Sequence, residues 1–303
     1  MNNSNDFHTT ASDDKLAAAA ILAVCVSGLS VYCCYITVVL RVSEFYENPY
    51  HRIASVVGIC DCIILLNIAG YCVPSIALHR SLGGHWINLG VNCCITFSNF
   101  SGLSLTCALA FNRYFCVCKH SVYKAVFKTE NVNRIIAGCL MFGLFYSIPM
   151  WHPCCRAFLY PEIYGFGRSI RGSGGLLFTY IDLSLICTTC AIAAACNTCV
   201  FVSYRRLHKV SNDGDNIQTE VDNRRREYKL FLQFFVIVAY LQALAIVFVL
   251  AQLMELTKWA ILSITLMYCL QCSVNGWVYL ILNKTIRKHL FQLLNFQIAS
   301  ESE

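Results

Sequence analysis

The chain has 303 residues, of which 57% are hydrophobic and only 13% are charged, and its formal net charge is +6. A soluble domain of this length carries about a quarter charged residues, so the composition excludes an ordinary soluble protein. We attribute the basic excess to contact with anionic membrane lipids and with whatever docks on that face, and we expect no nucleic-acid partner.

Seven long apolar segments account for most of the chain. A helix rises about 1.5 Å per residue and a bilayer core is about 30 Å thick, so each segment can cross a membrane. Backbone groups in hydrocarbon must be paired within the segment, which makes runs this long helices. In chain order the segments are Leu16–Leu40, Ile53–Leu78, Val91–Cys116, Ile135–Trp151, Gly175–Val202, Leu230–Met254 and Trp259–Leu282. The sequence predicts an all-α membrane protein, a seven-transmembrane helix bundle.

The two ends of the chain are predicted to lie outside this bundle. Residues 1–15 are polar and predict an extracellular tail, residues 16–282 form the transmembrane domain, and residues 283–303 form a cytoplasmic helix and tail. The first apolar segment has no small-residue cleavage site, so we interpret it as a retained helix. Within 285–296 leucines and Ile286 recur at helical spacing beside basic residues, which predicts a short amphipathic helix on the membrane.

The distribution of basic residues predicts the orientation. With the N-terminus outside, 17 of the 23 Lys and Arg residues fall on the cytoplasmic side and 6 on the outer side. Positive charge concentrates on the cytoplasmic side of membrane proteins, so this orientation is favoured over its inverse. The basic runs between 205 and 229 are interpreted either as topology determinants or as docking sites, and both interpretations stay open.

The 20 cysteines lie mostly within the spans, where they act as small apolar residues. On the outer side, Cys93 or Cys94 can form a bridge with Cys154 or Cys155, because that compartment is oxidising. Trp86 favours Cys93 over its neighbour, whereas Cys154 and Cys155 are not distinguished. The alternative is that all four are buried thiols. No metal, cofactor or redox site is predicted, because no second cysteine pair and no histidine accompany Cys187 and Cys190.

Polar residues inside the spans require a reason, since each charged group costs about 2.5–3.5 kcal/mol on insertion. Asp61 and Asn275 lie about equally far from the cytoplasmic surface, so with Ser98 they predict a buried polar switch able to hold water or Na⁺. A purely structural hydrogen-bond network is the alternative.

A second set of polar residues lies nearer the outer surface and predicts a ligand pocket. Its members are Asp182, Thr96, Asn99, Tyr180, Gln252 and Tyr268. Taken singly, each is better explained by an interhelical hydrogen bond than by a ligand contact, and the pocket is predicted from the set at one depth. No lysine lies inside a span, which excludes a retinal pigment. Catalytic spacings and matched broken helices are absent, so neither an enzyme nor a common transporter is predicted.

Two motifs resemble a known family. The third span ends with Leu109-Ala110-Phe111-Asn112-Arg113-Tyr114-Phe115, followed by Tyr123 and Phe127, and the seventh ends with Asn275-Gly276-Trp277-Val278-Tyr279. Together they resemble the rhodopsin-like G-protein-coupled receptors, and most closely the nematode serpentine chemoreceptors of class x and its relatives. The resemblance implies that Arg113, with Asn112 and Tyr114, engages the G protein, and that Asn275, Gly276 and Tyr279 take part in activation.

Several positions depart from the broader family pattern. Asn112 replaces the acid that would pair with Arg113, and Gly276 replaces a proline. The resemblance matches Asp61 to the helix-two aspartate and Cys93 to the cysteine of the outer bridge, although Cys93 lies closer to Arg113 than is usual. An inactive state held less tightly is the expected consequence of Asn112.

The predicted function is that of a chemosensory receptor that transmits the binding of an extracellular small molecule to a heterotrimeric G protein. Membrane lipids are further partners, and the expected location is the plasma membrane with the N-terminus outside. The resemblance also implies a location in the cilia of sensory neurons. The alternative function is a ligand-gated seven-helix chemoreceptor channel, which requires the opposite orientation; a solute carrier or small membrane enzyme is a further rival.

Overall fold

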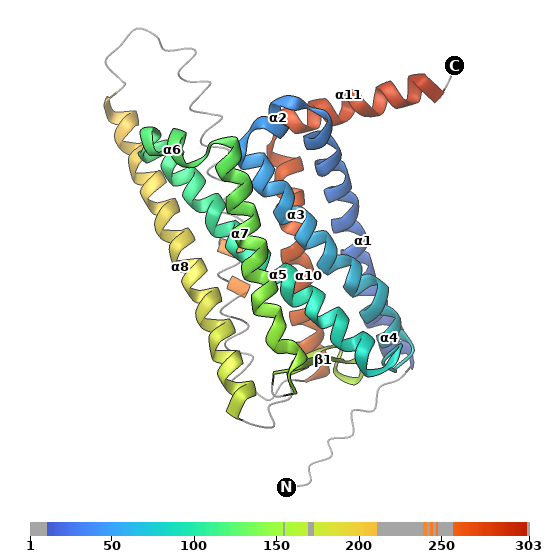
Figure 1. Ribbon diagram of the computed structural model, residues 1–303. Helices are drawn as coiled ribbons and strands as arrows, with labels where there is room; N and C mark the ends of the chain where they lie inside the picture. Colours follow the sequence, from blue (N-terminus) through green and yellow to red (C-terminus); the bar gives the residue numbers. More distant parts are fainter. Residues whose placement is uncertain are drawn as a thin grey trace.

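The computed structural model describes residues 11–153, 155–168, 173–210, 235, 239–240, 243–244, 247 and 257–301. These residues form a bundle of long helices (Figure 1). One end of the bundle carries a β-hairpin and the start of the first helix, and we call it the hairpin end. The opposite end carries three further helices, α2, α6 and α11, and we call it the α11 end.

The elements follow one another along the chain with short connections. The helices are α1 (Ala11–Arg41), α2 (Ser43–Glu47), α3 (Pro49–Asn67), α4 (Val73–Ala77), α5 (Gly84–Cys118), α6 (His120–Val126), α7 (Thr129–Ser147), α8 (Ser173–Val210), α10 (Lys258–Leu282) and α11 (Lys284–Glu301). A π-helical turn, η1 (Ile68–Cys72), joins α3 to α4, and 3₁₀ turns lie at η2 (Ile148–Trp151) and η3 (Pro161–Ile163). Strands β1 (Ala157–Tyr160) and β2 (Gly165–Arg168) pair antiparallel, with Leu159 opposite Phe166.

Six helical segments among the described residues are long and apolar enough to cross a membrane. They correspond to six of the seven predicted spans. The predicted span Leu230–Met254 lies outside the described residues, apart from a few positions. One of these, Tyr240, donates a hydrogen bond of 2.9 Å to the carbonyl of Met267 in α10.

The helices are longer than the apolar segments that predicted them. α1 begins at Ala11 rather than at Leu16, α5 begins at Gly84 rather than at Val91, and α8 continues to Val210. The reason at α1 is electrostatic: Asp13 and Asp14 lie in its first turn, where carboxylates interact favourably with the helix dipole. The tail predicted over residues 1–15 is therefore shortened by the start of this helix.

The second span has a locally widened turn. Pro74 stands at the start of α4 and lacks the N–H that an α-helix would need there. The preceding residues Ile68–Cys72 form a π-helical turn, and the span continues through it without a break. α4 is closely followed by His79, whose backbone lies in the left-handed region (φ 49). The N–H of His79 donates to the carbonyl of Ile76, and the N–H of Arg80 donates to the carbonyl of Ser75.

Two glycines allow α1 and α10 to approach closely. A Cβ added at Gly28 of α1 would lie 2.2 Å from Ser273 Oγ of α10. A Cβ at Gly276 of α10 would lie 3.0 Å from Val31 of α1. Small residues at such positions let membrane helices pack backbone to backbone. This close packing is a structural reason for a glycine at position 276, where the broader family has a proline.

α5 packs against α3, α7 and α8, while α1 packs against α3 and α10. Buried side chains between these helices form one large cluster toward the α11 end, which includes Tyr35, Leu105 and Tyr279. A second cluster, which includes Ile21 and Tyr164, lies toward the hairpin end. α11 leaves the bundle at a steep angle (Figure 1), and its first turn is capped by the side chain of Asn283, which accepts from Thr285 and Ile286.

Candidate functional site

Arg113 lies near the α11 end of α5, and its guanidinium is stacked on a tyrosine ring. The guanidinium carbon is 3.8 Å from the centre of the Tyr50 ring at the start of α3. Tyr50 is only 5% exposed, so the contact is largely removed from water. Cation–π attraction is strongest in such desolvated positions, where it reaches about 2 kcal/mol. Tyr50 was not among the residues that the sequence singled out.

Tyr50 also connects Arg113 with α10 and α1. Its hydroxyl donates a long hydrogen bond of 3.4 Å to the hydroxyl of Tyr279. The Tyr279 ring stacks in turn on Tyr35 of α1, with centroids 4.8 Å apart, and Tyr35 approaches His51 of α3 at 3.4 Å. All four of these side chains are buried. The predicted activation residues Arg113 and Tyr279 are thus brought together through a tyrosine on a third helix.

The neighbours of Arg113 in the sequence face α6. Asn112 is 2% exposed and lies near Tyr123 of α6, and its Nδ2 is buried without a hydrogen-bond partner among the described residues. Burial raises the pKa of Tyr123, and the nearby Asn112 amide and Arg113 guanidinium partly oppose that rise. Tyr114 packs edge to face against Phe115, which approaches Phe127 after α6. The motif residues 112–115 therefore anchor the short helix α6 beside α5.

Asp61 and Asn275 meet near the middle of the bundle, as their depths predicted. Asn275 Nδ2 donates to Asp61 Oδ2 at 3.2 Å, and the hydroxyl of Tyr32 in α1 donates to the same oxygen at 2.5 Å. Tyr32 was missed from the sequence, because nothing in its spacing showed that it points toward α3. The role of Asp61 and Asn275 as a switch stays a prediction.

A cavity of about 40 Å³ adjoins this cluster between α3, α5 and α10. It is lined by Asp61, Ser98, Asn99 and Asn275 among others. Ser98 Oγ and Asn275 Oδ1 are buried without a hydrogen-bond partner. A cavity of this size has room for two or three water molecules, and unpartnered polar atoms are the groups that such water satisfies. Ser98 therefore lies beside Asp61, as predicted, although no hydrogen bond joins them.

The predicted ligand-pocket residues divide into two groups. Tyr268 of α10 donates to Asn99 Oδ1 at 3.3 Å, and Thr96 lies one turn above Asn99 on α5. Asp182 of α8 instead accepts a hydrogen bond from Tyr146 of α7. Tyr180 is 67% exposed on α8, and Gln252 lies outside the described residues. No contact in the described part of the chain joins Asp182 to Asn99, so their membership of one pocket stays a prediction.

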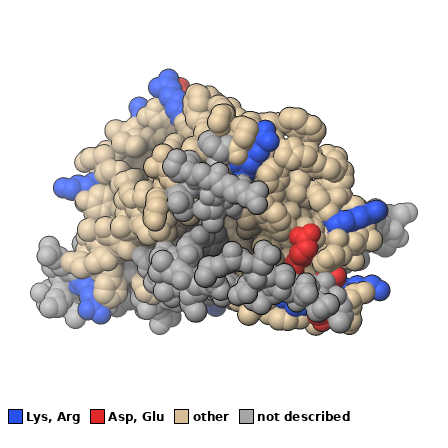
Figure 2. Space-filling model, turned by 90° about the horizontal axis from the view of Figure 1, so that it is seen from below, with Lys and Arg blue, Asp and Glu red and all other residues tan. Residues whose placement is uncertain are grey.

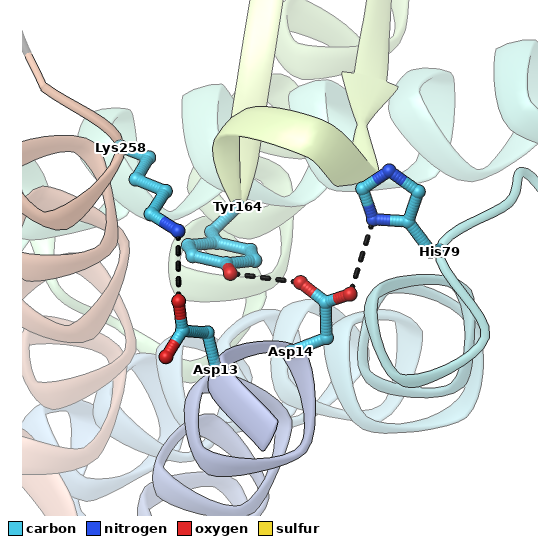
Figure 3. Close-up of polar contacts among 5 residues, drawn as sticks. All are labelled: Asp13, Asp14, His79, Tyr164 and Lys258. Atoms are coloured by element: carbon cyan, nitrogen blue, oxygen red, sulfur yellow. Dashed lines mark hydrogen bonds and ion pairs between the residues drawn. The ribbon is translucent and has the colours of Figure 1, made fainter. Parts of the chain in front are cut away.

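The hairpin end contains a polar cluster that the sequence did not reveal (Figure 3). Asp14, which is 4% exposed, accepts from Tyr164 at 2.8 Å and lies 3.1 Å from His79 Nδ1. Lys258 at the start of α10 pairs with Asp13 at 2.9 Å. Burial and the bond with Asp14 raise the pKa of Tyr164 well above its usual range. The cluster joins α1, α10, the end of α4 and the hairpin.

Basic side chains on the described surface of this end are isolated and lie mostly near its rim (Figure 2). No three His, Cys, Asp or Glu side chains within the described ranges are placed to hold one metal ion.

The predicted bridge from α5 to the hairpin loop is corrected by the structure. Cys93 and Cys94 are both free thiols. Cys155 is disulfide-bonded, so its partner is neither of them, and Cys154 lies outside the described residues. The physical reason is packing, because Cys93 is enclosed by Leu89 and Met150 in a small apolar cluster. The alternative interpretation, that Cys93 is a buried thiol, is the one that the structure supports.

Hydrogen bonds from Asn88 hold the hairpin to α5 instead. Asn88 Nδ2 donates to the carbonyl of Leu159 at 3.2 Å, and Asn88 Oδ1 accepts from the amide of Leu159 at 3.0 Å. The amide side chain thus pairs with both backbone groups of one strand residue, as a neighbouring strand would. Asn92 donates to Asn88 Oδ1 and fixes its orientation. The two asparagines one turn apart were the available sequence signal.

Comparison with solved structures identifies the class of protein. The crystal structure of squid rhodopsin matches with a TM-score of 0.79 at 13% sequence identity, over 96% of this chain and 87% of that chain. At this identity the likeness concerns the fold alone. The chain therefore has the rhodopsin-like seven-transmembrane fold. No curated protein matches the sequence.

The sequence comparison then gives the family. The family model described as "Serpentine type 7TM GPCR chemoreceptor Srx" matches residues 22–283. The chain belongs to this family, and it is a multi-pass membrane protein and a chemosensory G-protein-coupled receptor. Proteins of this kind in general couple to G proteins, respond to extracellular ligands and are receptors rather than enzymes. Neither comparison supports the channel alternative.

Proposed function

We propose that the receptor lies in the plasma membrane with its hairpin end outside, and that it transmits the binding of an extracellular small molecule to a heterotrimeric G protein at the α11 end. In this orientation 17 of the 23 basic residues lie on the cytoplasmic side. Sensory cilia are the proposed location by resemblance. The chain itself performs no catalysis in this account.

The observation that carries the proposal is the position of Arg113. It lies at the α11 end, next to Tyr279 of α10 and beside α6, where the two family motifs converge. A G protein can insert a helix into a groove at this end once the surrounding helices separate. The ligand biases the equilibrium between the closed and open arrangements, because it binds one of them more tightly.

The route from ligand to Arg113 passes through the cavity in the middle of the bundle. Asn99 lines this cavity and also accepts from Tyr268, which lies in the proposed ligand pocket. Asp61 and Asn275 line the same cavity, and Asn275 precedes Tyr279 by four residues on α10. A ligand that displaces Tyr268 from Asn99 therefore acts on groups that share one cavity with Asp61.

The test is the substitution Arg113→Ala. Receptor-stimulated nucleotide exchange on the G protein should fall at least tenfold, because the cation that engages the partner is removed, while surface delivery is retained. Arg134→Ala is the matched control, since Arg134 is exposed at the same end on α7. Full exchange by the Arg113 variant would refute the role of this residue.

The pocket is tested separately by Asn99→Ala. We expect a shift in the dose–response curve of any agonist found by screening small molecules against receptor-expressing cells. Asp182→Asn tests the second group of pocket residues in the same assay. An unchanged curve for either variant removes that residue from the pocket without affecting the assignment of Arg113.

A further inference from the structure

The residue before Arg113 is an amide rather than an acid, yet the arginine occupies a defined position. Asn112 is neutral and buried, and its Nδ2 has no hydrogen-bond partner in the described part of the chain. The ring of Tyr50 covers one face of the Arg113 guanidinium, at 3.8 Å. A tyrosine ring can hold a cation by its negative face, and it does so without the charge that an acid would bring into a buried site.

The position of Tyr50 is fixed by the start of α3. Asn48 caps this helix by accepting from the amide of Tyr50 at 3.0 Å, and Pro49 occupies the first helical position. Both features set the direction in which α3 begins, so the ring of Tyr50 projects from a rigid turn. The hydroxyl of the same ring reaches Tyr279 of α10. Tyr50 therefore contacts α5 by its face and α10 by its edge.

The guanidinium face that Tyr50 covers is not accessible to a docked partner. We propose that Tyr50 is the positioning residue that holds Arg113 in the inactive arrangement, an inference that rests on the proposed function. Activation separates the Arg113 guanidinium from the Tyr50 ring and breaks the hydroxyl contact between Tyr50 and Tyr279. We call this pair of contacts the tyrosine–arginine contact.

The strength of the contact sets the expected effect. Loss of one desolvated cation–π interaction changes the ratio of active to inactive receptor on the order of tenfold. The hydroxyl contact at 3.4 Å is at the long limit of hydrogen bonding, so its loss alone should change the ratio only about twofold.

The experiment compares three variants at equal surface density without agonist. Tyr50→Leu removes the ring and should raise basal nucleotide exchange about tenfold. Tyr50→Phe keeps the ring and should raise it only about twofold, and Tyr279→Phe should match Tyr50→Phe. Tyr46→Leu is the control, because Tyr46 is an exposed tyrosine of α2 that packs under Arg52 at 5.5 Å. It should leave basal exchange unchanged.

A second measurement follows Arg113 directly and needs no G protein. An arginine-selective dicarbonyl reagent is applied to membranes, and modification of the Arg113 peptide is quantified by mass spectrometry. Tyr50→Leu should increase this modification severalfold over wild type and Tyr46→Leu should not. If Tyr50→Leu is not delivered to the surface, Tyr50→Phe and Tyr279→Phe decide by the twofold rise in exchange.

The outcomes separate this inference from the proposed function. If Tyr50→Leu leaves the modification of Arg113 unchanged, the inference is overturned. It is also overturned if Tyr50→Leu increases that modification but leaves basal exchange unchanged, provided that Arg113→Ala is inactive. Equal exchange by wild type and Arg113→Ala refutes the proposed function instead. In that case the labelling still shows whether Tyr50 covers Arg113, but the contact no longer controls signalling.

Discussion

Among the described residues, Lys258 at the hairpin end and the half-buried Arg113 at the α11 end are held differently, although both lie over aromatic rings. Lys258 at the hairpin end pairs with the carboxylate of Asp13 at 2.9 Å, beside the second carboxylate of Asp14. Arg113 at the α11 end stacks on the ring of Tyr50. Breaking this ion pair leaves the mostly buried ammonium of Lys258 unpaired, although the Asp13 side chain is 31% exposed. A cation over a ring is released at lower cost. We therefore expect the contacts of Lys258 at the hairpin end to persist during activation, and the contact of Arg113 at the α11 end to be broken.

The largest expected effect comes from breaking the hairpin end at Asp14. Asp14→Ala should destabilise the receptor by about 3 kcal/mol, because the buried hydroxyl of Tyr164 loses its acceptor and the exposed ring of His79 loses its contact with the carboxylate. The measurement is thermal unfolding in detergent together with surface delivery. Asp14→Asn keeps an acceptor for Tyr164 and should cost less. An equal loss of stability in both variants would mean that the charge of Asp14, and not its hydrogen bond with Tyr164, stabilises this end.

A smaller effect distinguishes hydrogen bonding from a disulfide as the attachment of the hairpin. Asn88→Ala should cost about 2 kcal/mol, because both backbone groups of Leu159 lose their partner. Cys93→Ser, one turn further along α5, breaks no bridge and should change stability by less than about 1 kcal/mol. The same unfolding assay compares the pair. A large loss in the cysteine variant would restore the predicted bridge.

The smallest effect is confined to alkaline conditions. The pKa of Tyr164 is raised in the folded receptor, so the folded state retains the phenol proton more tightly than the unfolded state. Stability from this group is complete below its unfolded pKa of about 10 and declines as the pH rises above that value. Tyr164→Phe should remove this decline. An identical pH profile in both proteins would exclude Tyr164 as its source.

The sequence predicted the helices well, because apolar length alone determines a membrane span. It also placed Asp61 opposite Asn275, since two helices of known direction let depth be counted along the chain. Contacts that depend on the rotation of a helix about its axis were not predictable. Tyr32, Tyr50 and Asn88 belong to this group, and each binds a residue at least 29 positions away.

The helix ends and the bridge were predicted less accurately for a related reason. Asp13 and Asp14 appeared to belong to a polar tail, but their partners Lys258 and His79 draw them into the first turn of α1. Cys93 matched a family position, yet it is a free thiol packed in a small apolar cluster with Leu89 and Met150. Local polarity and motif position both failed where distant parts of the chain supply the partner.

The glycine-mediated packing of α1 on α10 has a consequence for how the receptor moves. With Gly28 facing Ser273 and Gly276 facing Val31, any sliding of one helix along the other drives side chains into backbone. These two helices therefore travel as a single unit. The displacement that uncovers Arg113 must then arise from α5 or α3 shifting against this unit, which makes the first and last spans the fixed frame of the signalling event.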